Sequence, residues 1–154
     1  MHDLIEVIRR DYALDWHGIH GIDHFRRVMD NGRALAGRTG AKMHLVDLFA
    51  IFHDARRIND RIDPGHGRRA AELVKSLQGD LLSLSRTDCD LLVHACTYHT
   101  DGLVDGDPTV QTCWDADRLD LGRAGIQPLP EKLCTSAAKD PAILKWAYER
   151  SISG

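Results

Sequence analysis

The stretch Leu48-Phe49-Ala50-Ile51-Phe52-His53-Asp54 passes from five apolar residues directly to a histidine and an aspartate. The apolar residues belong to a predicted helix over 43–58 that is apolar on nearly all sides, which is typical of a central buried helix. Burying an aspartate beside a histidine is costly unless both are paired or bound to a metal ion. Adjacent helical residues point about 100° apart, so both can still reach one ion near the helix end. A His-Asp hydrogen bond without metal is the alternative interpretation.

Helices are also predicted on either side of this stretch, and together they indicate an all-α fold, a compact bundle in one domain over 1–154. Asp63 is expected to cap a helix with Pro64 at its first position and Gly79 just past its end. Thr87 to Asp90 resembles a capping box. The motif-bearing core spans about 16–122. The predicted helices are 3–12, 23 to 37 or 40, 43–58, 64–78, 87–98, 108–119 and 141–151.

Composition narrows the classes of protein to consider. The hydrophobic share is 43%, the charged share is 28% and the formal net charge is −3, which is ordinary for a globular domain and argues against a general nucleic-acid or membrane-surface binder. The four cysteines contain no C-x-x-C pair, so a structural zinc knuckle is not expected. No apolar run approaches the roughly 20 residues of a membrane span. We therefore expect a cytoplasmic protein with free thiols.

Two further segments carry candidate metal ligands. His24 follows Asp23 at the start of a predicted helix, and Asp117 lies in the acidic segment Trp114-Asp115-Ala116-Asp117-Arg118-Leu119-Asp120. Taken alone, this acidic segment is more typical of a solvated turn than of a metal site. Histidine is a common metal ligand, and the chain contains nine histidines, so a site built from several of these residues is worth considering.

The ordered set His24, His53-Asp54 and Asp117 resembles the HD-domain superfamily. In that family the first histidine lies in a D-x-x-H-x-x-R-V-like context, whereas here Asp23 is adjacent to His24. The final aspartate matches in Ala116-Asp117-Arg118-Leu119, and the chain most resembles small stand-alone HD hydrolases with a D-A-D-R-L-D segment. The resemblance implies a helical fold and a divalent ion (Mg, Mn, Fe, Co, Ni or Zn) bound by His24, His53, Asp54 and Asp117.

The resemblance also implies roles for other histidines. In two-metal members, histidines placed like His66 and His94 complete a second metal site, so these residues are expected to bind a second ion or substrate phosphate. The structural alternatives are a solvent-exposed helix-start histidine and a satisfied core histidine. The sequence therefore does not decide whether the site holds one ion or two. His99 lies five residues after His94, off the same helical face, and is a candidate substrate contact from the helix end.

Arginines near the motif are candidates for binding phosphate, because a phosphate site needs cations. Arg57 is the first choice, and Arg56 and Arg27 are further candidates; such charge runs are otherwise usually solvated faces. His20 is one turn before His24, and Asp115 is close to Asp117. Both residues are expected to lie next to the metal ligands without binding the ion themselves.

These features predict a metal-dependent phosphohydrolase that acts on a phosphate ester, a nucleotide or related small phosphorylated molecule, through metal-activated water. His94 or His66 would donate a proton to the leaving oxygen. A two-iron HD oxygenase and a non-catalytic nucleotide-binding sensor are the alternatives. We expect a small phosphorylated molecule as partner, without a stable nucleic-acid complex or a membrane; the sequence leaves the oligomeric state open.

Overall fold

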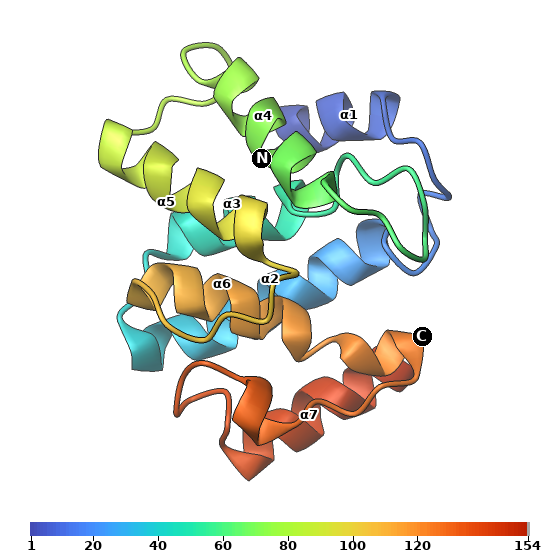
Figure 1. Ribbon diagram of the computed structural model, residues 1–154, viewed down its shortest axis with the longest axis vertical. Coiled ribbons are helices and arrows are strands. Elements are labelled where there is room, and N and C mark those ends of the chain that lie inside the picture. Colours follow the sequence, from blue (N-terminus) through green and yellow to red (C-terminus); the bar gives the residue numbers. More distant parts are fainter. Residues whose placement is uncertain (154) are drawn as a thin grey trace.

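The computed structural model describes residues 1–153, and its central element is the helix α3 (Met43–Phe52). It packs against α2 (Ile22–Thr39), α4 (His66–Leu77), α5 (Arg86–Tyr98) and α6 (Pro108–Arg118), which surround it (Figure 1). Most α3 side chains from Leu45 onward are buried. This agrees with an apolar sequence that leaves the helix without a polar face to turn toward water.

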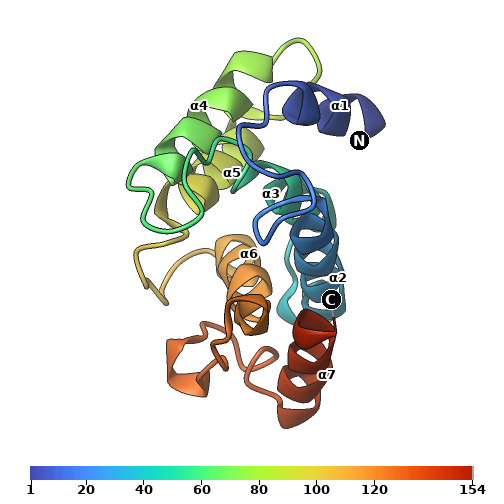
Figure 2. The same ribbon diagram turned by 90° about the vertical axis from the view of Figure 1, so that its right-hand side faces the viewer.

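The two ends of the bundle are closed by different elements. The first helix α1 (His2–Arg10) lies at one end, and α7 (Pro141–Ile152) lies at the opposite end (Figure 2). Two short 3-10 helices, η1 (Leu121–Ala124) and η2 (Pro130–Lys132), connect α6 to α7, and α7 packs on η1. A small apolar cluster distinct from the main core fixes this end: Leu35, Leu119, Leu133, Ala137, Ala138 and Ala147.

The all-α prediction is confirmed: residues 1–153 contain seven α-helices, two 3-10 helices and one isolated bridge between Gln78 and Leu82, with no strand. The four cysteine thiols are free. Within the described residues, we find no helix with the length and apolar character needed to span a bilayer.

The predicted helix over 43–58 is too long, because α3 ends at Phe52. The Asp63 carboxylate accepts hydrogen bonds from the backbone N–H groups of Ile58 (2.7 Å) and Asn59 (3.3 Å). These N–H groups are therefore not available for helical bonds to earlier carbonyls. The residues after Phe52 form turns instead, which place His53 and Asp54 at a helix end.

The start of the fourth helix is also corrected. Asp63 does not cap it, and Pro64 lies outside it, because Gly65 adopts a left-handed conformation (φ 85°) and α4 begins at His66. Asp63 instead pairs with Arg69 at 2.6 Å. Similarly, α5 is capped by Ser85, whose hydroxyl accepts a hydrogen bond from the Asp88 N–H, and not by the predicted Thr87 box.

The remaining boundaries differ less. The second helix begins at Ile22 after Gly21, one residue before the predicted Asp23 cap, and ends at Thr39, where the left-handed Gly40 (φ 75°) caps it. Pro108 opens α6 as predicted, with Asp107 as its cap. Helix ends of this kind are set by single caps, and a shift of one or two residues is ordinary.

Candidate metal centre

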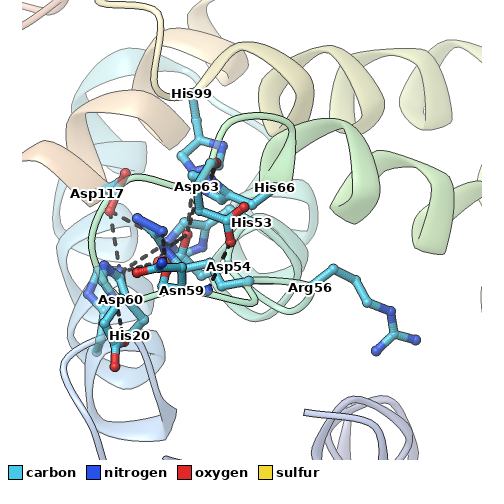
Figure 3. A network of polar contacts seen from close by, with 12 residues as sticks. His20, His53, Asp54, Arg56, Asn59, Asp60, Asp63, His66, His99 and Asp117 are labelled. Carbon is cyan, nitrogen blue, oxygen red and sulfur yellow. Dashed lines mark hydrogen bonds and ion pairs between the residues drawn. The ribbon is translucent and has the colours of Figure 1, made fainter. Parts of the chain in front are cut away.

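Six potential ligand side chains converge from five helices or their ends. His24 comes from α2, His53 and Asp54 follow α3, His66 opens α4, His99 follows α5 and Asp117 lies in α6. They form two groups, and the ligand atoms within each group lie within 4.8 Å of one another. We call His24, His53 and Asp117 the first cluster, and Asp54, His66 and His99 the second cluster. Figure 3 shows how residues from both lie around Asp54.

Asp54 joins the two clusters. Its Oδ2 atom is 3.4 Å from Nε2 of both His24 and His53. Its Oδ1 atom is 3.2 Å from His66 Nε2 and 3.5 Å from His99 Nε2. Because the two carboxylate oxygens face different clusters, Asp54 is placed to bridge two ions.

Backbone carbonyls fix the protonation of three of the histidine rings. Nδ1 lies 2.7 Å from the Asp63 carbonyl in His66 and 2.7 Å from the Cys96 carbonyl in His99. In His53, Nδ1 lies 3.0 Å from the Phe49 carbonyl. A carbonyl oxygen only accepts, so each Nδ1 carries the proton and donates it. In the neutral ring, Nε2 is then left with a lone pair directed into the cluster.

These lone pairs face each other. Nε2 of His66 is 3.0 Å from Nε2 of His99, and Nε2 of His24 is 3.0 Å from Nε2 of His53. Two neutral acceptors at this distance, as in the His66–His99 pair, repel unless a cation lies between or beside them. In the His24–His53 pair, the proton on His24 lies between the two nitrogens when no metal ion is bound. Two nitrogens each about 2.0–2.1 Å from one zinc-like ion would be separated by about 3 Å. The donor set therefore fits a divalent ion in each cluster, and nitrogen with carboxylate oxygen is compatible with Mn, Fe, Co, Ni or Zn.

Asp120 contacts His24 of the first cluster on the side away from the ligand atoms. It was not identified as a site residue from the sequence. Its Oδ2 is 2.6 Å from His24 Nδ1, and its Oδ1 accepts a hydrogen bond from Arg27 Nε at 2.8 Å. A carboxylate on the far nitrogen of a ligand histidine fixes its tautomer and raises its basicity. The only sequence signal was the last acid of the D-A-D-R-L-D segment.

The charges in the first cluster stabilise each other. Burial and the nearby Arg123 charge lower the pKa of His24, but Asp117, Asp120 and Asp54 outweigh them and raise it to about 9. Burial raises the pKa of Asp54, yet His53, His24, His66 and His99 hold it well below the ordinary value of 3.8. The carboxylates are thus ionised at neutral pH and ready to accept a cation, which would displace the proton on His24.

Two glycines allow the helices to approach closely enough to assemble the clusters. A Cβ on Gly32 in α2 would lie 2.2 Å from Val46 Cγ1 in α3, and a Cβ on Gly67 in α4 would lie 2.5 Å from the Cys96 carbonyl oxygen in α5. Gly32 therefore permits the helix pair that carries His24 and His53. Gly67 does the same for the pair that carries His66 and His99.

Both clusters open on one cavity of about 610 Å³. Asp54, His66, His99 and Asp117 line it on one side, and the cations around it are Arg57, Arg61, Arg118, Arg123 and Lys132. A cavity of this size is within the range of small-molecule sites. It offers positive charge next to the candidate metal ligands.

The structure places four of the secondary candidates at this site. His66 and His99 form the second cluster. Arg57 lines the cavity, with Nε 3.5 Å from Asp54 Oδ1. His20 lines it as well, with Nδ1 2.8 Å from Asp60. His99 was predicted only as a substrate contact from the helix end, because the sequence does not show that its ring faces His66.

The other four candidates belong to neither cluster and do not line the cavity. His94 is exposed and packs on Tyr98 and Trp114, which also removes it as a proton donor. Asp115 is buried, but its carboxylate accepts hydrogen bonds from residues 134 and 135. Arg56 points away from the clusters (Figure 3). Arg27 binds Asp120 and supports the site from behind.

Comparison with known proteins agrees with this geometry. The HD domain profile matches residues 21–122. The chain belongs to the HD domain family. The HD fold is also seen in a crystal structure of a predicted HD superfamily hydrolase from an uncultured Thermotogales bacterium, with a TM-score of 0.74 and 22% sequence identity. That alignment covers 99% of this chain and 87% of the other. A search of curated proteins gave no match.

Proposed function

We propose that this HD protein is a metal-dependent phosphohydrolase that holds two divalent ions and cleaves the phosphate ester of a small molecule. The observation that carries the proposal is the shared Asp54 between two clusters whose histidine lone pairs converge, at the floor of a cavity surrounded by cations. The Thermotogales relative is described as a predicted hydrolase, which agrees with this function. Nucleotides are the first substrate class to screen.

When bound, divalent ions would polarise a phosphoryl oxygen and lower the pKa of water. The six ligands would hold the ions, with one Asp54 oxygen facing each cluster. Asp120 keeps His24 in the orientation that directs Nε2 into the first cluster. The backbone carbonyls of Asp63 and Cys96 do the same for His66 and His99. The protein therefore supplies a preorganised set of donors that needs little rearrangement.

Arg57 is the strongest candidate for binding phosphate. It is 9% exposed and lines the cavity, and its buried Nε lacks a hydrogen-bond partner within residues 1–153. An unsatisfied guanidinium N–H is costly to bury, and a phosphate oxygen would satisfy it. The Arg57 NH1 group is fixed by a 2.9 Å hydrogen bond to the Asn59 carbonyl, so the guanidinium is already oriented.

The test is phosphate release from a panel of phosphate esters, nucleotides included, with Mg²⁺, Mn²⁺, Co²⁺ or Ni²⁺ added to metal-free protein. We expect turnover that requires metal and is lost in Asp54→Asn but kept in Asp30→Asn, which removes a half-exposed carboxylate outside both clusters. Bound metal without phosphate release from any ester would overturn the proposal.

A two-iron oxygenase is the second candidate, because a carboxylate shared between two clusters of mixed nitrogen and oxygen donors also fits two iron ions. Iron-dependent consumption of O₂ without phosphate release would favour it. Phosphate release with redox-inactive Mg²⁺ would argue against it.

A further inference from the structure

One side of the cavity is built by residues that follow the last ligand candidate. Six apolar residues line it there, which we call the apolar wall: Leu121, Ala124, Ile126, Pro128, Leu129 and Leu133. Ile126 is 53% exposed and Leu129 is 46% exposed. Large apolar side chains that gather in a cavity while still open to solvent are typical of a ligand-binding surface.

The apolar wall is held in place by the surrounding structure. Arg118 NH1 donates a 2.9 Å hydrogen bond to the Lys132 carbonyl, and the buried Asp115 carboxylate accepts one from the Cys134 N–H at 2.7 Å. Leu133 is 2% exposed and belongs to the small apolar cluster beneath α7. These contacts hold the backbone at the C-terminal end of the apolar wall against the rest of the fold.

The two sides of the cavity differ in chemistry. Asp54, Asp117 and Arg57 line the cavity next to the clusters, and the segment 118–133 contributes the apolar wall together with Arg118, Arg123, Gln127 and Lys132. The guanidinium groups of Arg118 and Arg123 already donate hydrogen bonds to backbone carbonyls. A phosphate group at the polar side would bring its esterified group onto the apolar wall. Hydroxyl groups placed against the apolar side chains would lose water, and the guanidinium groups of Arg118 and Arg123 are already engaged by backbone carbonyls, which makes such placement unfavourable.

We propose that the apolar wall is a subsite for the esterified group, and that the substrate is a phosphomonoester of an apolar alcohol. This inference rests on the proposed phosphohydrolase function for the direction of the phosphate. The wall then contributes specificity, because each methylene group bound in an apolar pocket changes selectivity by roughly tenfold or more.

A binding measurement tests the wall without requiring turnover. Calorimetry compares hexylphosphonate with methylphosphonate, two inert probes, on the metal-loaded protein. We expect hexylphosphonate to bind at least about tenfold more tightly, with a negative heat-capacity change. Leu129→Ser should remove most of this gain. The matched control Leu81→Ser, at a leucine 39% exposed and outside the cavity lining, should keep it. Equal affinities for the two probes, or an unchanged gain in Leu129→Ser, would overturn the inference.

A kinetic comparison separates this inference from the proposed function. Hexyl phosphate and sorbitol 6-phosphate are primary esters of six-carbon chains that differ mainly in their hydroxyl groups. We expect kcat/KM to favour hexyl phosphate, and Leu129→Ser to reduce kcat/KM for that ester alone. Hydrolysis of both esters with equal efficiency would overturn the apolar subsite and leave the phosphohydrolase standing. Wall-dependent binding of hexylphosphonate without hydrolysis of any ester would support the subsite and overturn the phosphohydrolase.

Discussion

The two clusters use the same imidazole geometry but differ in what surrounds it. In the first cluster, Asp117 is a ligand candidate and Asp120 binds the far nitrogen of His24. In the second cluster, both far nitrogens bind backbone carbonyls, and Asp54 is the carboxylate of the group. More negative charge around the first cluster should hold a divalent ion more tightly there. Two similar histidine pairs can thus give ions of unequal affinity.

Removing the shared carboxylate should have the largest effect. Asp54→Asn takes one ligand charge from both clusters, and we expect phosphate release to fall by about a thousandfold or more, because metal stabilisation of the transition state contributes several kcal/mol. Steady-state kinetics at saturating metal would measure this. A loss of tenfold or less would mean that Asp54 is not shared between two ions.

Removing Asp120 should affect the first cluster alone. Asp120→Asn keeps every ligand but weakens the hydrogen bond that orients His24, so we expect the tighter ion to bind about 10- to 100-fold more weakly. Competition with a coloured chelator would measure this affinity, with Asp30→Asn as the control. A loss confined to the weaker ion would contradict the assignment of Asp120 to the first cluster.

Gly67→Ala should affect the second cluster instead. The added Cβ would collide with the Cys96 carbonyl oxygen, so α4 and α5 must separate, at a cost of about 1–3 kcal/mol in the free energy of unfolding. The weaker ion should lose affinity as His66 and His99 move apart. Chemical denaturation and metal titration would measure both effects.

Gly37→Ala is the matched control, because a Cβ at Gly37 in α2 meets no atom within 4 Å. That variant should be as stable as the parent or slightly more stable, since alanine favours the helix over glycine. Equal destabilisation by both substitutions would show that the close approach at Gly67 is not what matters.

Asp63→Asn should give the smallest effect and a dependence on pH. Burial raises the pKa of Asp63, but Arg69 and the N–H groups of Ile58 and Asn59 outweigh it and lower the pKa below 3.8. A lowered carboxyl pKa stabilises the folded state above pH 3.8, and this contribution is lost as pH falls through the folded-state pKa. The variant should be about 1–3 kcal/mol less stable at pH 7. The difference should shrink below about pH 3.8. A gap that stays constant on acidification would contradict this origin.

Helical periodicity predicted the all-α fold, and the resemblance to the HD-domain superfamily implied the residues that meet in the first cluster, whereas the His53-Asp54 pair alone left a metal-free hydrogen bond open. For the second cluster, the prediction named His94 as a ligand where the structure places His99. The predicted end at residue 98 of the helix that carries His94 agrees with α5, but helical periodicity does not show that His99 then turns back toward His66. Asp120 and the cavity cations Arg118, Arg123 and Lys132 were also not identified as site residues, since their positions depend on how the chain packs from the end of α6 onward. Arg61, another cavity cation, lies in the turns between α3 and α4 and was not identified either.

Titration of metal-free protein with Mn²⁺ in a calorimeter tests the central claim most directly. The two-cluster account predicts two ions per chain in two steps of unequal affinity. His24→Gln should remove the tighter step, and His99→Gln should remove only the weaker one. A single ion per chain, with a titration unchanged in His99→Gln, would contradict the account.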